Sequence, residues 1–146
     1  MTGRRGQPAA TLAVPKPPSG SRRWPFGISH SAMSIYLFGC MSFCFGVLTL
    51  LRPEQAAARL ELPSEAIPAI QACSLAAIAI GVFYTLAAYQ ENRAFFRCSL
   101  LTRSLTTWVL WNASKEWGSA WKEVALWEGT AAAVTAVALV WDWWLK

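Results

Sequence analysis

The stretch that decides the fold is AMSIYLFGCMSFCFGVLTLL, residues 32–51, which runs for 20 residues without a charged side chain. As an α-helix it would be about 30 Å long, which matches the hydrocarbon thickness of a bilayer. A buried helix of this length in a water-soluble protein normally keeps a polar face. The Arg52-Pro53 pair ends the run. The stretch therefore predicts a membrane-spanning helix.

A second apolar run covers residues 68–90. Cys73, Ala77 and Gly81 recur in it at every fourth position, a spacing that lets two helix backbones approach closely within lipid. The alternative explanation is that alanine is simply common in helices. The short polar connection that follows predicts that the second and third spans are antiparallel neighbours.

The third predicted span, residues 94–113, is marginal because it contains Arg97 and Arg103. A central arginine costs about 2.5–3.5 kcal/mol on insertion scales, and each leucine or phenylalanine returns about 0.3–0.6 kcal/mol. We expect this helix to insert with help from its neighbours, with Arg103 turned inward. The fourth predicted span, residues 121–144, contains Glu128 about two turns from its start.

These segments predict an all-α fold, an integral membrane four-helix bundle formed by residues 29–146. The composition agrees, because 55% of the residues are hydrophobic and only 14% are charged, against about 25% charged in soluble domains. Residues 1–28 are rich in proline and arginine, and we expect them to form a disordered cytosolic tail. Residues 52–67 are expected to form a loop with one or two helical turns, since Pro53 suits a helix start.

The distribution of charge predicts the topology. Five basic residues precede the first apolar run, and no acidic residue appears before Glu54. By the positive-inside rule both termini are expected in the cytosol. The endoplasmic reticulum is the expected membrane. A mitochondrial membrane is the alternative, because the tail contains arginine and no acid, although its five prolines disfavour an amphipathic presequence.

Arg103 and Glu128 are the sharpest candidates for a site. Their predicted depths differ by about 5 Å, which an arginine side chain can span, and a lone charge within lipid would be costly. Spacing of three and four residues puts further hydroxyls on the helical face of Arg103, and these complete the predicted binding set: Ser99, Thr106 and Thr107. The pair either fixes the register of two helices or lines a polar cavity that binds a headgroup or moves a proton.

The sequence shows no pattern typical of a metal site, a cysteine pair or a catalytic motif. His30 is the only histidine and is expected to cap or to be solvated, so neither a metal site nor a cofactor is expected. The four cysteines, Cys40, Cys44, Cys73 and Cys98, form no CxxC pair and are expected to pack at helix contacts. No nucleophile motif, HExxH or phosphate loop occurs.

Several stretches carry a family resemblance: LLRPEQAAARLELP, AAYQENRAFF, LLTRSLTT and LWEGTAAAVTAVAL. In this order the chain resembles the small four-helix membrane proteins called DoxX-like, over about residues 30–140. The resemblance implies a four-helix bundle without an assigned reaction. The stretch AAYQENRAFF is also similar to the endoplasmic-reticulum scaffold protein of ergosterol biosynthesis, which implies a tethering role.

The expected function is that of a multi-pass membrane protein that acts as a scaffold or binds a small lipophilic ligand. Its expected partners are the lipid bilayer, other membrane proteins or a lipophilic small molecule. Nucleic acid is not expected, because no aromatic-basic surface accompanies the charge. The alternative is a small membrane-embedded enzyme of the isomerase or cyclase type. In it Glu128 would be the acid or base and Arg103 would orient it.

Overall fold

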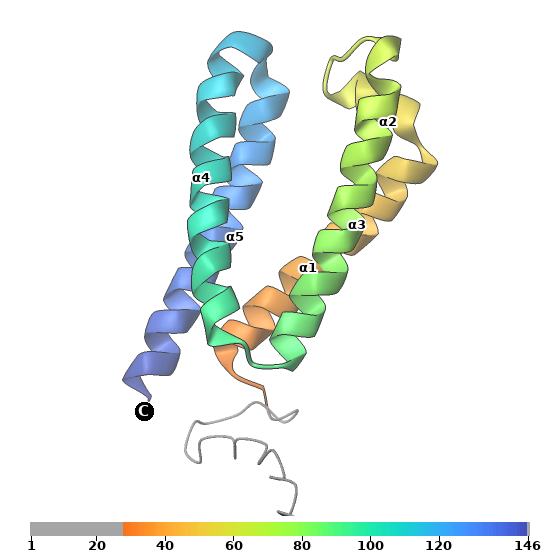
Figure 1. Ribbon diagram of the computed structural model, residues 1–146. Helices are drawn as coiled ribbons and strands as arrows, with labels where there is room; N and C mark the ends of the chain where they lie inside the picture. The colour runs from red at the N-terminus through yellow and green to blue at the C-terminus, as the bar shows by residue number, and fades with distance from the viewer. Residues whose placement is uncertain (1–27, 146) are drawn as a thin grey trace, which may run out of the picture.

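The computed structural model describes residues 28–145, and every element in that part of the chain is helical (Figure 1). The all-α prediction is therefore confirmed. The predicted tail, residues 1–28, lies outside the described residues except for its last position. The elements in order are α1 (His30–Leu51), α2 (Pro53–Arg59), a 3₁₀ turn (Ser64–Ala66), α3 (Ile67–Tyr89), α4 (Arg93–Trp117) and α5 (Ser119–Trp144).

Local sequence explains most helix boundaries. Ser29 caps α1 by accepting a hydrogen bond from the Ala32 amide, and Asn92 caps α4 by accepting one from the Phe95 amide. Pro53 occupies the start of α2, where its missing N–H costs nothing. Between Leu51 and α3, the predicted helical turns of residues 52–67 are present as α2 and the 3₁₀ turn.

The turn between α4 and α5 is much shorter than the sequence suggested. The predicted spans end at residue 113 and begin again at residue 121, but α4 continues to Trp117 and α5 begins at Ser119. In this added turn of α4 the Ser114 hydroxyl donates a hydrogen bond to the Trp111 carbonyl of the same helix. Gly118 alone makes the reversal, with φ at 102°, a conformation that favours glycine.

The four long helices form two antiparallel hairpins (Figure 1). One hairpin consists of α1 and α3, and the other of α4 and α5. The hairpins meet mainly where the first part of α1 crosses α5, close to the connection between α3 and α4. Farther along, at the end that carries α2 and the α4–α5 turn, they part (Figure 1).

The α1–α3 contact is built from small residues. A side chain at Gly39, Gly46 or Gly81 would meet backbone atoms of the facing helix, so the two backbones approach closely. The predicted close approach is confirmed at Gly81. It is wrong at Cys73, which is exposed, because the contact face runs instead through the buried Ser74.

Three of the cysteines contradict the predicted packing role. Cys44, Cys73 and Cys98 are exposed, and Cys40 is half-buried. The prediction failed because the closest helix contacts are made by glycine and serine, which leaves the thiols on the outer surface.

Within residues 28–145, three segments are long and apolar enough to cross a membrane: His30–Leu51, Ser64–Tyr89 and Ser119–Trp144. These correspond to the first, second and fourth predicted spans. The helix α4 does not reach the same hydropathy, since it carries three arginines among several hydroxyl side chains.

Candidate functional site

Arg103 lies where α1, α4 and α5 come together, and only 3% of its surface is exposed. Its Nε atom lies 3.4 Å from Oε2 of Glu128, so the predicted pair meets. Its Nη1 atom lies 3.5 Å from the hydroxyl of Thr135. The guanidinium carbon sits 3.6 Å from the centre of the Phe38 ring, so α1 contributes a cation–π contact.

The hydrogen bonding of this guanidinium is incomplete. Both of its hydrogen bonds are longer than the usual 2.7–2.9 Å or so of charge-assisted pairs. Its Nη2 atom is buried and has no hydrogen-bond partner among the described residues. An unmet buried donor costs about 1–3 kcal/mol, and more for a charged group. Arg103 therefore has donor capacity that the described part of the protein leaves unused.

Glu128 is more open than its partner. Its side chain is 20% exposed, against 4% for the side chain of Arg103. Among the described residues it receives one hydrogen bond, from Arg103. The pair thus combines a buried cation with a carboxylate that reaches the surface of the protein.

The position of Glu128 follows from the divergence of the hairpins. On α1, Ser31, Ile35 and Phe38 lie on one helical face and are buried. The same face continues through Met41 and Phe45, which are exposed. Arg103 contacts Phe38, the last buried residue of this face, so the pair sits where the contact between the two hairpins ends.

The hydroxyls predicted to share the site act differently. Ser99 is buried and donates to the Phe96 carbonyl. The Thr107 hydroxyl donates to the carbonyl of Arg103, and its methyl group packs on Gly129. Thr106 is exposed and donates to the Thr102 carbonyl. The structure thus keeps Ser99 and Thr107 near Arg103, whereas Thr106 faces outward; their binding roles stay predictions.

A second polar cluster, which the sequence analysis missed, holds the start of α1. Oδ1 of Asp142 accepts hydrogen bonds from the His30 amide at 3.2 Å and lies 3.0 Å from Nδ1 of the same residue. Oδ2 accepts from the Ser31 amide at 2.9 Å and the Ser31 hydroxyl at 2.6 Å. Glu91 accepts from the amide and the hydroxyl of Ser29, both at 2.7 Å. Two carboxylates therefore bind the amide-rich end of one helix.

One signal in the sequence pointed to this cluster. Glu128, Thr135 and Asp142 recur every seven residues, which places Asp142 on the inward face of α5. Its partner lies more than 100 residues away at the start of α1. Only the packing of α1 on α5 brings them together.

Replacement of Asp142 by alanine should remove this attachment. The substitution leaves two amides and a buried hydroxyl without acceptors, so we expect a loss of about 3 kcal/mol in the free energy of unfolding. Denaturation of the purified protein in detergent would measure it. The matched control is Asp142→Asn, which keeps one acceptor oxygen and should lose less than half as much. Equal losses would show that one acceptor oxygen is not enough and that the cluster depends on both carboxylate oxygens.

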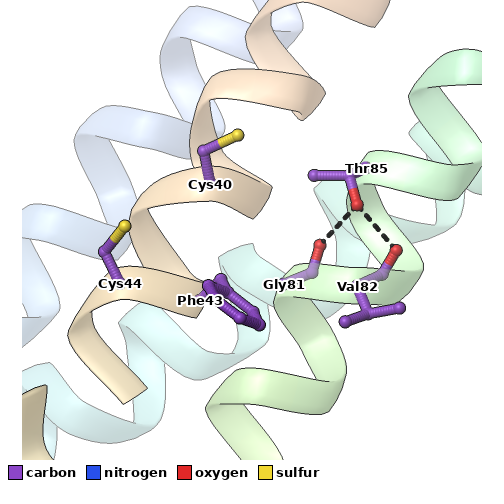
Figure 2. Close-up of a pocket in the computed structure, with 6 residues that line it drawn as sticks. All are labelled: Cys40, Phe43, Cys44, Gly81, Val82 and Thr85. Carbon is purple, nitrogen blue, oxygen red and sulfur yellow. Dashed lines mark hydrogen bonds between the residues drawn. The ribbon is translucent and has the colours of Figure 1, made fainter. Parts of the chain in front are cut away.

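An apolar groove of about 270 Å³ lies elsewhere, on the outer surface between α1 and α3. It is lined by Cys40, Phe43, Cys44, Gly81, Val82 and Thr85 (Figure 2). The Thr85 hydroxyl donates to the carbonyls of Gly81 and Val82, so it offers the groove no free donor. In residues 28–145 no cluster of three or more histidine, cysteine or acidic side chains could hold a metal ion.

Comparisons of the chain with protein-family models, with curated proteins and with solved structures give no match. The geometry of the site therefore carries the functional argument.

Proposed function

We propose that this protein is a multi-pass integral membrane protein in which α1, α3, α4 and α5 each cross the bilayer. The observation that carries the proposal is the reversed polarity of α4. This helix buries Ser99 and Arg103, whereas Leu101, Leu105 and Trp108 are 73%, 61% and 65% exposed. In water such a helix would expose its apolar face and bury its charge, but in lipid the same arrangement is favourable.

The polar side chains on the exposed part of α4 are compatible with lipid. The hydroxyls of Thr102, Ser104 and Thr106 each donate to a carbonyl three or four residues earlier in the same helix. Such internal bonds satisfy the hydroxyls where no water is present. Arg97 lies one turn from the start of α4, so its side chain can extend to the interface.

The arrangement of the helices supports a topology with both termini on one side. The start of α1, the connection between α3 and α4, and the end of α5 lie at the same end of the molecule (Figure 1). Arg93 lies at this end, and five basic residues precede α1 in the sequence. The positive-inside rule assigns this end to the cytosol.

The native cysteines offer a direct test of membrane insertion. Cys44 is exposed in the fold, so a water-soluble protein would react there with a membrane-impermeant maleimide. We expect little reaction at Cys44 in intact membranes and full reaction after denaturation in detergent. A cysteine placed at Ser64, in the exposed connection, is the positive control. Rapid reaction at Cys44 before denaturation would contradict the proposal, and a cysteine at Leu105 would test α4 in the same way.

Within this membrane protein, the Arg103–Glu128 site binds a small lipophilic molecule. The support is the incomplete hydrogen bonding of Arg103 beside a carboxylate that is open to the surface. The site lies where the hairpins part, so a molecule dissolved in the bilayer could reach it. The resemblance to DoxX-like proteins supports the same architecture.

Analysis of molecules that co-purify with the protein tests this function. We expect one class of lipophile to be enriched over the bulk membrane and to be lost from the Arg103→Leu/Glu128→Leu double variant, which should still fold. The matched control is Arg97→Leu on the exposed face of α4, which should keep the enrichment. A wild-type profile identical to the bulk membrane would contradict the binding function.

A membrane enzyme is the second candidate, and the partial exposure of the Glu128 carboxylate favours it. A carboxylate beside an arginine can transfer a proton to or from a bound molecule. Metabolite profiling of a deletion strain separates the two functions. An enzyme predicts that one substrate accumulates and one product disappears, and that Glu128→Gln reproduces this change. A binding protein predicts altered distribution without such a substrate–product pair.

A further inference from the structure

We propose that the molecule bound at the Arg103–Glu128 site presents an uncharged headgroup with an acceptor oxygen, either a hydroxyl or a carbonyl. This inference rests on the proposed binding function and specifies the chemical class of the ligand. It follows from three properties of the site, namely the unused donors, the balance of charge and the apolar walls.

The guanidinium has three sides already in use. Its planar face lies over the Phe38 ring, its Nε faces Glu128 and its Nη1 faces Thr135. The remaining group, Nη2, is buried without a partner among the described residues. An acceptor oxygen on the ligand would supply the hydrogen bond that this charged donor lacks.

The charge of the site excludes a charged headgroup. Arg103 and Glu128 already compensate each other at 3.4 Å. An anionic headgroup would leave a net negative charge, and a cationic one a net positive charge, in a region of low dielectric constant. An uncharged oxygen completes the hydrogen bonding and leaves the site neutral. A hydroxyl can in addition donate to Glu128, which receives one hydrogen bond among the described residues.

The remaining surroundings fit an apolar molecule. Beyond Phe38, the side of α1 that faces α5 continues through Met41 and Phe45, both of which are exposed. On the other hairpin, Val124 lies one turn before Glu128 and is also exposed. A ligand with its oxygen at Arg103 would therefore extend its hydrocarbon part along apolar side chains.

Competition in reconstituted membranes tests the headgroup. The full chain is placed in phosphatidylcholine nanodiscs and labelled with a photoreactive, clickable derivative of hexadecanol. Hexadecanol, hexadecanone, hexadecane, hexadecanoate and hexadecylamine then compete at equal mole fraction. We expect the alcohol and the ketone to compete about tenfold better than the hydrocarbon, as one added hydrogen bond allows, and the acid and the amine no better than the hydrocarbon.

Variants test whether the preference for alcohol over hydrocarbon depends on Arg103 and Glu128. The Arg103→Leu/Glu128→Leu double variant should still be labelled but should no longer distinguish alcohol from hydrocarbon. Arg97→Leu, on the exposed face of the same helix, should distinguish them as the wild type does. Saturable labelling with equal competition by alcohol and hydrocarbon would overturn the headgroup assignment and leave the binding function standing. Preference for the acid or the amine would also overturn it, whereas absence of saturable labelling would contradict the binding function itself.

Discussion

Replacement of either Arg103 or Glu128 by leucine should destabilise the protein by about 3–5 kcal/mol, because each change leaves one charge uncompensated in a region of low dielectric constant. Arg103 is almost entirely buried and Glu128 is its only ionic partner among the described residues. The guanidinium in Glu128→Leu would keep only the long contact with Thr135 and the Phe38 ring. The fraction of folded protein after solubilisation, measured by size-exclusion chromatography and denaturation, gives the effect.

The double variant decides how the pair acts. Replacing both members of a buried ion pair with apolar residues is often neutral, so Arg103→Leu/Glu128→Leu should recover most of the lost stability. Additive losses in the double variant would contradict the pairing. Recovery of folding together with normal cellular function would show that the pair only fixes the register of α4 and α5. Recovery of folding without function would assign the charges to binding or chemistry.

Gly81→Ala should have the second large effect, a loss of about 3 kcal/mol in the free energy of unfolding. A methyl group at this position would lie 2.6 Å from Cβ of Phe43, 2.7 Å from its amide nitrogen and 2.8 Å from the Gly39 carbonyl oxygen. Two of these atoms belong to the backbone of α1, so relief requires that the helices move apart. Denaturation in detergent would measure the loss.

Gly129→Ala is the matched control for this substitution. All its nearest atoms belong to the Thr107 side chain, the closest at 3.0 Å. A helical glycine replaced by alanine gains about 1 kcal/mol in intrinsic propensity, which offsets a small movement of Thr107. We expect a change within about 1 kcal/mol at Gly129. A loss at Gly81 as small as that at Gly129 would show that the α1–α3 contact is less closely packed than its geometry indicates.

The sequence predicted the long helices well because their apolar runs end at strong local signals. Arg52-Pro53 terminates α1, and the polar stretch QEN, residues 90–92, separates α3 from α4. It also predicted that Arg103 meets Glu128, since depth within the predicted spans brought the two charges to similar levels. Both predictions depend on patterns within one or two neighbouring helices.

What the sequence could not provide depends on contacts between distant helices. The division into two hairpins comes from glycines that face backbone on α1 and α3, and helical periodicity does not name the partner of such a face. Asp142 and Ser31 are joined only because α1 crosses α5 at its end. The orphan Nη2 of Arg103 is likewise invisible in the sequence, since it depends on side-chain conformation in the folded protein.

The pairing of Arg103 with Glu128 across the Gly118 turn sets an order of events during biosynthesis. Glu128 follows Arg103 by 25 residues, so at about 5–20 residues per second the ribosome delivers the carboxylate roughly 1–5 seconds after the arginine. Through that interval α4 carries an unmatched cation, and in the proposed topology it gains a stable place in lipid only when α5 follows. The α4–α5 hairpin should therefore leave the translocon as one unit. A chain that ends at a stop codon before Glu128 should be degraded rather than inserted.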